Sequence, residues 1–445
     1  METAQQPTLQ TYPAYKPSGV EWLGDIPEGW EAVKMKYLFR DISIKGKPEE
    51  TLLSVTQNQG VIPRDWVENR MVMPSGNLET FKFIRKGDFA ISLRSFEGGL
   101  EYCYHDGIIS PAYTVLKMKS SLVSEYYKYL LKSKSFISEI QTSVIGIREG
   151  KNISYPELSY SLLPVPSAEE QTAIANFLDV KTQKIDAAIV QKQQLITLLK
   201  ERKQILIQDL VTGKKVWDEA TQSWKAPAKT KDSGVEWIGE IPEGWGVKKL
   251  THSVRKLVDG THFSPKSFES GDYKYITAKN IKQSGFDFTN LSYITQKDHD
   301  TIFPRCPVSQ GDVLYIKDGA TAGIAMVNTL TEEFSLLSSV ALIRPNLDII
   351  SAQYLSAYLN SDVIRNFIKT QIVGGALTRL TLELISRFKI IAPSQKEQNQ
   401  IVQEIQTQSS KIDKAIGLQE QQIEKLQEYK RVLVDSCVRG KVKVS

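Results

Sequence analysis

One segment of thirteen residues occurs twice and constrains the architecture of the chain more than any other feature. Residues 18–30 (SGVEWLGDIPEGW) return as residues 233–245 (SGVEWIGEIPEGW), with 11 of 13 positions identical and the other two changed conservatively. A repeat this close indicates two copies of one folding unit. We therefore expect a tandem architecture in which each half of the chain folds in a similar way.

A second pair of matching segments lies downstream of the first. Residues 166–171 (PSAEEQ) correspond to residues 393–398 (PSQKEQ), and the offset between copies is 215 residues in the first pair and 227 in the second. Between these repeated frames, the two inserts at 31–165 and 246–391 are only faintly alike. Drift after duplication is the simpler explanation, but uniform drift would not spare the frames. We infer that the frames perform one mechanical task twice, while the inserts recognise different things.

Length and composition fit a globular protein with several domains. The chain has 445 residues, of which 41% are hydrophobic and 24% charged, and a net charge of +5. Cys103, Cys306 and Cys437 are odd in number and far apart, so they build neither a disulfide framework nor a local metal site. A reducing cytoplasm fits this pattern best. The sequence shows neither a signal-peptide pattern nor about 18 consecutive apolar residues, so we expect neither secretion nor membrane spanning.

The segments that follow residues 166 and 393 have the pattern of long helices. Ser167 and Ser394 each begin a Ser-x-x-Glu capping box, and Gly213 and Gly440 stand where a C-terminal cap glycine belongs. In both segments apolar residues step alternately by four and three, as in a coiled-coil seam. The expected seam residues are Ile185, Ile189, Ile196, Leu199, Leu206, Leu210, Ile412, Ile416, Ile423, Leu426 and Leu433.

Polar residues interrupt both seams at corresponding points, namely Lys192 and Lys203 in the first segment and Gln419 and Lys430 in the second. Such residues cost stability but fix register and partner choice. A single apolar stripe more often packs against its own domain, but two matched stripes in one chain favour pairing with each other. Antiparallel pairing would place the inserts at opposite ends, related by an approximate two-fold axis.

The inserts alternate short apolar runs with Gly, Asn, Asp and Pro, which predicts many short strands. Each insert then has one expected helix, near residues 124–136 and 351–367. The predicted fold class is α+β, with two α+β domains separated by two long antiparallel coiled-coil helices in a pseudo-two-fold tandem repeat. The expected divisions are 1–165 for the first domain, 166–213 for the first long helix, 214–391 for a linker with the second domain, and 392–445 for the second long helix.

Charge is distributed unevenly along the chain. Residues 31–165 carry a net charge of +3 and residues 246–391 one of +4, whereas the segments that contain the thirteen-residue repeats are acidic. Scattered surface Lys and Arg are most often simply solvated. Two basic inserts held apart by a spacer nevertheless suit a reader of two DNA half-sites, because phosphate contacts position a protein and base contacts give it specificity.

Familiar catalytic and metal-binding patterns do not occur in the sequence. Residues 146–152 (GIREGKN) resemble a phosphate-binding loop, but one spacer residue is missing and Asn152 replaces the hydroxyl residue that holds magnesium. Cys103 and His105 offer two ligands where zinc takes four. The tetrapeptide of amino-methylating enzymes and the Gly-x-Ser-x-Gly elbow are also missing. We therefore expect no catalytic residue, metal or cofactor in this chain.

Taken in order, the motifs resemble the specificity subunits of type I restriction-modification systems. The thirteen-residue repeat is similar to the segment that introduces each target recognition domain of that family, and the PSxxEQ segments resemble the start of its long helical regions. The first insert departs from the pattern, because the DGTH run of the second insert has no counterpart near position 45. In the second insert, four motifs are similar to ones in such domains: 259–262 (DGTH), Asn280 with Ile281, 311–314 (GDVL) and 318–321 (DGAT).

This resemblance implies a non-catalytic, cytoplasmic subunit that binds double-stranded DNA, with each recognition domain reading one half of a bipartite target. It also implies that the coiled coil sets the spacer and docks two methyltransferase subunits, which use S-adenosylmethionine to methylate adenine. Restriction subunits that use ATP and magnesium would complete the assembly. A stand-alone DNA-modifying enzyme and a coiled-coil scaffold with peptide-binding ends remain the alternatives.

Candidate DNA contacts are basic residues expected in loops of the inserts, because arginine makes bidentate contacts to guanine and lysine suits phosphates. The candidates are Arg64, Arg94, Arg148 and Lys151 in the first insert, and His262, Lys266, Lys279, Lys317 and Arg379 in the second.

Overall fold

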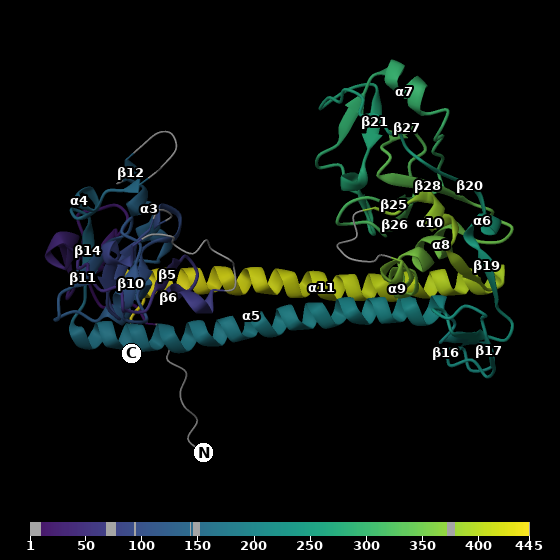
Figure 1. Ribbon diagram of the computed structural model, residues 1–445. Helices are drawn as coiled ribbons and strands as arrows, with labels where there is room; N and C mark the ends of the chain where they lie inside the picture. The colour runs from purple at the N-terminus through teal and green to yellow at the C-terminus, as the bar shows by residue number, and fades with distance from the viewer. Residues whose placement is uncertain are drawn as a thin grey trace. The chain divides into compact units, whose positions relative to one another are not determined.

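Two compact units make up the protein. The first unit consists of Met1–Gln193 with Glu420–Ser445, and the second unit consists of Gln194–Gln419. Each unit contains one insert and part of each long helix (Figure 1). The computed structural model describes residues 10–67, 77–92, 95–142, 144–145, 152–371 and 379–444.

The two long helices are α5 (Ala168–Val211) and α11 (Gln395–Val438), with 44 residues each. In the first unit Lys430 Nζ donates to Asp186 at 2.7 Å, and in the second unit Lys203 Nζ donates to Asp413 at 2.8 Å. Residue numbers rise along one helix as they fall along the other, so the pair is antiparallel in each unit. The α+β class and the antiparallel helix pair predicted from the sequence are both confirmed.

The apolar stripes of α5 and α11 face the interior of the helix pair. Six of the expected seam residues are buried, and the other five are half-buried. The buried ones are Ile185, Ile196, Leu210, Ile412, Ile416 and Leu433, and the half-buried ones are Ile189, Leu199, Leu206, Ile423 and Leu426. Of the helices in the described ranges, none combines the length and the apolar character that a bilayer crossing requires.

Both units contain a four-stranded antiparallel sheet with the same topology. The strand order is β4-β11-β8-β9 in the first unit and β20-β28-β25-β26 in the second. In chain order both sheets read first, fourth, second, third, so the faintly similar inserts share one core topology. The bounds are Phe39–Ile42 (β4), Thr114–Met118 (β11), Phe89–Ile91 (β8), Glu101–Tyr102 (β9), Val254–Asp259 (β20), Val340–Pro345 (β28), Val313–Ile316 (β25) and Ala325–Val327 (β26).

The prediction of a single helix near residues 124–136 and another near 351–367 is wrong, because each of these stretches contains a break between two helices. The first insert has α2 (Ser124–Leu130) and α3 (Lys134–Thr142), and the second has α8 (Ala352–Leu359) and α9 (Asp362–Thr370). The break has a local cause in the first insert, where Ser133 Oγ accepts from the backbone N–H of Phe136 at 3.3 Å and so caps a new helix.

The remaining strands form small sheets and hairpins. In the first unit they are β1 (Tyr15–Pro17), β2 (Asp25–Pro27), β3 (Glu31–Lys34), β5 (Leu53–Thr56), β6 (Gly60–Pro63), β7 (Lys82–Ile84), β10 (Gly107–Ile109), β12 (Val144–Ile145), β13 (Asn152–Ile153) and β14 (Leu162–Val165). In the second unit they are β15 (Val216–Asp218), β16 (Ser223–Lys225), β17 (Thr230–Asp232), β18 (Glu240–Pro242), β19 (Gly246–Lys249), β21 (Tyr273–Ile276), β22 (Ile281–Lys282), β23 (Gly285–Phe286), β24 (Ser292–Ile294), β27 (Phe334–Leu336) and β29 (Lys389–Ala392).

Short helices and 3-10 turns connect these strands. They are η1 (Met35–Tyr37), η2 (Arg64–Trp66), η3 (Leu78–Thr80), α1 (Ser95–Gly98), α4 (Tyr155–Leu158), α6 (Leu250–Ser253), η4 (Ala278–Asn280), α7 (Gln296–Ile302) and α10 (Leu382–Ser386).

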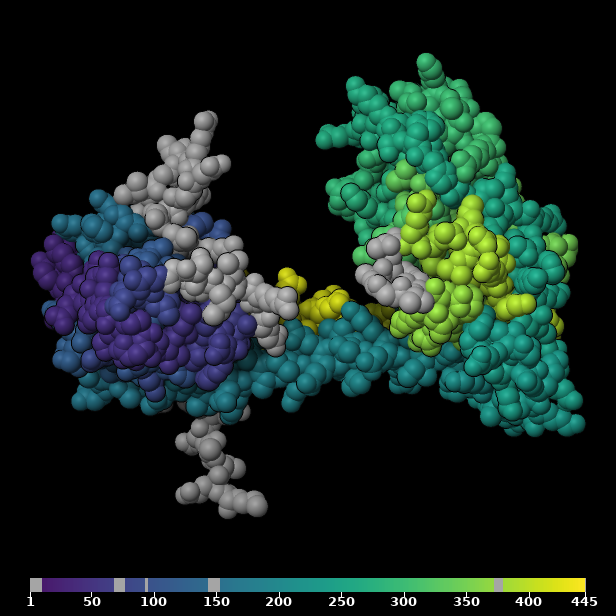
Figure 2. Space-filling view, in the orientation of Figure 1, coloured from purple at the N-terminus to yellow at the C-terminus, as the bar shows by residue number. Residues whose placement is uncertain are grey.

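The second unit has a lobe beyond its four-stranded sheet. The lobe contains the three-stranded sheet β24-β21-β27 and helix α7. Within this unit, Figures 1 and 2 show the lobe farther from the long helices than the four-stranded sheet. It has an apolar cluster of its own around Tyr275, Ile294 and Ile302, separate from the cluster that includes Leu210 of α5.

The repeated tryptophan of the first frame ties together the ends of both long helices. Trp30 is buried, and its Nε1 donates to Glu170 in the first turn of α5 at 2.8 Å. Gly440, just past the end of α11, has φ +70°, and a Cβ there would lie 2.4 Å from Pro27 Cδ and 3.0 Å from the Trp30 ring. Only glycine fits that position.

The second frame repeats this arrangement with the roles of the helices exchanged. Trp245 Nε1 donates to Glu397 at the start of α11 at 2.9 Å. Gly213, past the end of α5, has φ +75°, and a Cβ there would lie 2.4 Å from Pro242 Cδ. Each frame therefore joins the first turn of one long helix to the last turn of the other, which explains why this segment occurs twice.

Residues near the two ends of the described chain form a backbone bridge in the first unit, and a hairpin occupies the corresponding place in the second unit. The backbone N–H of Lys443 donates to Gln10 O at 2.7 Å, and the two residues form an antiparallel bridge. In the second unit Val216 pairs with Lys225 in the hairpin β15-β16. These two residues correspond to Lys443 and Gln10 by the offsets of 227 and 215. The bridge in the first unit thus repeats the pairing of a continuous hairpin.

Candidate nucleic-acid interface

The topology of the second sheet gathers polar residues at one of its edges. Strands β20 and β25 both pair antiparallel with β28, so they run parallel to each other and end on the same side. Asp259 is the last residue of β20, and Lys317 with Asp318 follows directly after β25. The sheet therefore brings together residues that are about sixty positions apart in the sequence.

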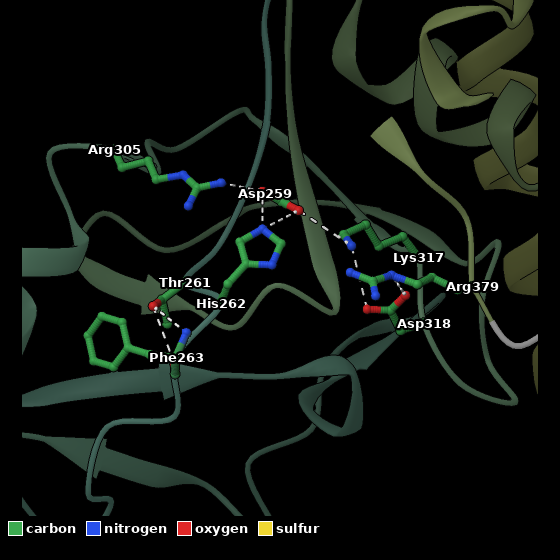
Figure 3. A network of polar contacts seen from close by, with 8 residues as sticks. All are labelled: Asp259, Thr261, His262, Phe263, Arg305, Lys317, Asp318 and Arg379. Atoms are coloured by element: carbon green, nitrogen blue, oxygen red, sulfur yellow. Dashed lines mark hydrogen bonds and ion pairs between the residues drawn. The ribbon is translucent and has the colours of Figure 1, made fainter. Parts of the chain in front are cut away.

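Asp259 is the centre of a network of basic side chains (Figure 3). It is 3% exposed, and its carboxylate oxygens lie 3.0 Å from Arg305 Nη2, 3.1 Å from His262 Nε2 and 3.4 Å from Lys317 Nζ. A buried carboxylate without such partners would be costly, so the two cations and the imidazole that surround Asp259 stabilise one another's placement through it.

The network continues on its other side to the end of a separate segment. Lys317 Nζ also lies 3.5 Å from Asp318 Oδ2, and Arg379 Nε lies 3.5 Å from Asp318 Oδ1. The backbone N–H of Leu380 donates to Lys317 O at 2.6 Å, and Asp318 and Arg379 form an antiparallel bridge. Arg379 is thereby anchored to the turn that carries the 318–321 motif.

Lys317 is placed differently from the sequence-based expectation. It was expected to face DNA, but its side chain is 2% exposed and lies between two carboxylates. A lysine in this position cannot reach a phosphate or a base edge. Its role in this arrangement is to hold Asp259 and Asp318 in place, so it is a positioning residue.

The DGTH motif owes its glycine to a close backbone contact, and backbone hydrogen bonds hold the next residue, Thr261. A Cβ on Gly260 would lie 2.0 Å from Leu336 O, so only glycine fits. Thr261 is buried, its backbone N–H donates to Leu336 O at 2.8 Å, and its O accepts from Ser338 at 2.8 Å. These bonds fix the chain immediately before His262.

The accessible part of the network is cationic. The side chains of Arg305 and Arg379 are 56% and 59% exposed, and that of His262 is 47% exposed, whereas Asp259 is buried. Guanidinium groups whose orientation is fixed by a carboxylate partner are suited to phosphates and to the O6/N7 edge of guanine. The arrangement is chemically fit for polyanion recognition at the end of a sheet.

Among the described residues there is neither a metal-binding cluster nor a thiol that is reactive at neutral pH. In the ranges that the structure covers, no group of three or more His, Cys, Asp or Glu side chains is arranged to hold a metal ion. Cys103, Cys306 and Cys437 are buried, and burial raises the pKa of each thiol to about 12. None of these thiols is therefore a nucleophile at neutral pH.

The other candidate residues lie outside this network. Lys266 is exposed, with its Nζ 5.3 Å from the centre of the Phe268 ring, and Lys279 is exposed on η4. Arg64 is half-buried on η2 of the first unit. The remaining three candidates, Arg94, Arg148 and Lys151, lie outside the described residues.

Sequence reasoning missed the residues that organise the network. Asp259 was visible as the first letter of the DGTH motif, and Asp318 as that of DGAT, but neither was assigned a role. Arg305 had no local signal, because it is 46 residues from Asp259 and follows α7 in a stretch without a motif. The two residues meet only through the tertiary fold.

In the first unit, the described residues that follow β4 differ in chemistry from those that follow β20. The residues that follow β4 are Ser43, Ile44, Lys45 and Gly46, among which there is no carboxylate. Ile44 is 45% exposed. The two inserts thus share a sheet topology but present different chemistry at its end.

Comparison with known sequences finds a family model that is similar to the second insert and much of α11. Residues 242–428 match the model of the Type I restriction modification DNA specificity domain. The chain is 22% identical over 431 residues to the Type I restriction enzyme MjaVIII specificity subunit of Methanocaldococcus jannaschii, with 94% of each chain covered. It is 25% identical over 259 residues to the Type I restriction enzyme EcoBI specificity subunit of Escherichia coli, which covers 58% of this chain and 53% of that one.

Solved structures show the same fold. The HsdS subunit from Thermoanaerobacter tengcongensis aligns with a TM-score of 0.51 at 16% identity, over 97% of this chain and 100% of that one. A chain from a structural study of complex assembly and conformational transition of the type I R-M system aligns with a TM-score of 0.61 at 16% identity, over 94% of this chain and 99% of that one.

Proposed function

We propose that the chain is a specificity subunit of a type I restriction-modification system, as its similarity to such subunits suggests, and that it reads a bipartite DNA target. Residues 1–165 would read one half and residues 214–391 the other. One observation carries the proposal. Each of the two equivalent frames is followed by one insert, and the two inserts share the topology of their four-stranded sheet but differ in surface chemistry. The comparisons give no support to a stand-alone DNA-modifying enzyme or to a peptide-binding scaffold.

In the second insert, Arg305, Arg379 and His262 are the proposed contacts to base edges and phosphates. Their exposed heads support this assignment, as does their attachment to carboxylates, which is to buried Asp259 for Arg305 and His262 and to half-buried Asp318 for Arg379. Lys266 and Lys279 are proposed phosphate contacts because they are exposed lysines on the same insert. In the first insert the proposed contacts remain Arg64, Arg94, Arg148 and Lys151.

The chemistry of modification and cleavage is assigned to partner subunits. We propose that two methyltransferase subunits supply S-adenosylmethionine-dependent adenine methylation and that restriction subunits supply ATP- and magnesium-dependent cleavage. An exposed apolar stripe on α5 is a suitable docking surface for a methyltransferase helix, since Leu195, Leu198 and Ile205 are 42%, 60% and 60% exposed. These residues lie outside the seam with α11.

The experiment that tests this function uses Arg305→Ala in the assembled methyltransferase. The variant removes an exposed guanidinium but leaves Asp259 paired with His262 and Lys317, so the fold should persist. We expect relaxed specificity at one position of the second half-site, equivalent to about 1–3 kcal/mol, with the first half-site unchanged. Competitive binding to a duplex library with every base substituted in turn measures this.

Arg255→Ala is the matched control. Arg255 is equally exposed and lies near the opposite end of the same strand, β20, where it contacts Asn346 and Asp348. The Arg255→Ala variant should bind the target with wild-type specificity. A single undivided recognition site would contradict the proposal of a bipartite target. A uniform loss of affinity over all sequences with Arg305→Ala would contradict the assignment of base reading to Arg305.

A further inference from the structure

The aromatic ring of Phe263 projects from the surface directly after the DGTH motif. Its side chain is 49% exposed. A single exposed apolar side chain is common on protein surfaces and means little by itself. What distinguishes Phe263 is the rigidity of the backbone that carries it and the charge of its neighbours.

The backbone at Phe263 is fixed by a buried residue. Thr261 Oγ1 lies 3.3 Å from both the backbone N and the backbone O of Phe263, in a tight turn. Thr261 is itself bonded to the Leu336 and Ser338 backbones, and Gly260 is packed against Leu336 O. The ring therefore extends from a preorganised turn, so little conformational entropy of the backbone is lost when it enters a ligand.

Basic side chains lie on both sides of Phe263 along the chain. His262 contacts Asp259, which also holds Arg305, and three residues later Lys266 is exposed. Figure 3 shows the ring of Phe263 extending away from Asp318 and Arg379. An apolar ring between phosphate-binding groups matches a duplex, in which the stacked bases lie between two phosphate backbones.

We propose that Phe263 inserts between two base pairs of the second half-site and partially unstacks them. This inference rests on the proposed DNA-reading function and specifies how the second insert engages its half-site. DNA-binding proteins use Phe, Leu and similar wedges in this way, and the cost depends on the base step. Pyrimidine–purine steps unstack most easily, so Phe263 would select such a step without any hydrogen bond to it.

The test places 2-aminopurine, whose fluorescence rises when it is unstacked, at each position of the second half-site in turn. In complex with the assembled methyltransferase, wild-type protein should raise the fluorescence several-fold beside one step. Phe263→Ala should abolish this rise and weaken binding by roughly 5- to 150-fold. Phe263→Leu, which keeps an apolar wedge, should retain part of the rise.

Phe288→Ala is the matched control, because Phe288 is 43% exposed in the same unit but stacks on Phe286 with ring centres 5.5 Å apart. It should leave the signal unchanged. A 2-aminopurine that the methyltransferase rotates out of the helix also fluoresces. That signal does not depend on Phe263, so it persists in Phe263→Ala and is distinguished from the signal of the wedge.

Two results would overturn the wedge: no enhanced step in the wild-type complex other than the methylated base, or an enhancement that persists in Phe263→Ala. In both cases a bipartite footprint with specificity at Arg305 would leave the proposed function standing. If the wild-type complex gave no sequence-specific footprint on DNA, that result would instead refute the proposed function itself.

Discussion

At the level of single residues, the two units solve one packing problem with different chemistry. In the first unit Lys132 Nζ, just past the end of α2, lies 2.5 Å from Glu101 Oε1 on the edge strand β9. In the second unit Asn360 occupies the end of α8 and exchanges two hydrogen bonds with Ala325 of β26, at 3.1 and 2.8 Å. A contact between a half-buried lysine and a buried carboxyl group thus takes the place of a neutral amide in the link between helix and sheet.

This difference predicts a pH dependence that belongs to the first unit alone. Burial raises the pKa of Glu101 from 4.5 to about 7, although Lys132 opposes the shift. Between these values the folded unit keeps a proton that the unfolded chain releases, so the contribution of Glu101 to stability is lost as the pH rises toward 7. Glu101→Gln cannot titrate, and its melting temperature should therefore rise relative to wild type as the pH increases.

Thermal unfolding of both proteins from about pH 5 to pH 8 measures this difference. Exposed Glu97 provides the control, because Glu97→Gln should follow the wild-type curve at every pH. Parallel curves for Glu101→Gln and wild type would show that Glu101 does not titrate in this range.

Individual site residues were the features least accessible from the sequence. The sequence draws attention to the DGTH run, but the partnership of Asp259 with Arg305 depends on which strand ends share a sheet edge. Lys317 was assigned to the surface for the same reason, since nothing in its neighbours along the chain reveals the two carboxylates around it. Local patterns identify turns, whereas charge networks need the topology.

At the level of elements, the long helices were predictable because periodicity and caps are local signals. Ser167 caps α5 through the backbone N–H of Glu170 at 3.2 Å, and Ser394 forms the reciprocal bonds with Glu397. The polar seam residues Lys203 and Lys430 find aspartates on the opposite helix. Exposed pairs of this kind add only about 0–1 kcal/mol each, so their effect is on register more than on stability.

The helix pair also gives a test of the proposed spacer. The residue numbers of the Asp186–Lys430 pair in the first unit and the Lys203–Asp413 pair in the second have the same sum, and by that sum the heptad 194–200 of α5 corresponds to 416–422 of α11. Deleting both sets of seven removes about 10 Å of helix, or roughly three base pairs of DNA, and two nearly whole turns. We expect a shorter spacer between two unchanged half-sites.

Mapping of methylated adenines in a host that carries the shortened protein reads out both halves and the spacer. A deletion of 194–200 alone provides the control, because it leaves the seams out of register and should destabilise the protein. Altered half-sites in the paired deletion would show that the helices do not act as a ruler.

At the level of the whole molecule, the chain closes on itself. Lys443 pairs with Gln10 as Val216 pairs with Lys225, so one joint is a covalent hairpin and the other only a hydrogen-bonded bridge. A permuted chain that opens between Ala220 and Thr221 and links Val444 to Gln10 exchanges the two joints. The opened turn is exposed, so we expect a melting temperature and a DNA target close to those of the wild type.

Opening the chain at Gly417 with the same linker is the control, because it interrupts α11 beside buried Ile416 and should prevent normal folding. Circular dichroism, thermal unfolding and the recognised target compare the three proteins. Failure of the hairpin permutant to fold would mean that the covalent joint at 216–225 is required.

The anchoring tryptophans have a consequence for how such a protein accumulates change. Trp30 holds the first turn of α5 and the last turn of α11, and Trp245 holds the opposite ends, so the two helices are clamped to equal length at both extremities. An insertion or deletion in one helix is then tolerated only if a compensating event of the same size occurs in the other. Lineages should consequently gain or lose helical turns in matched pairs, while the inserts, which carry no such constraint, diversify independently.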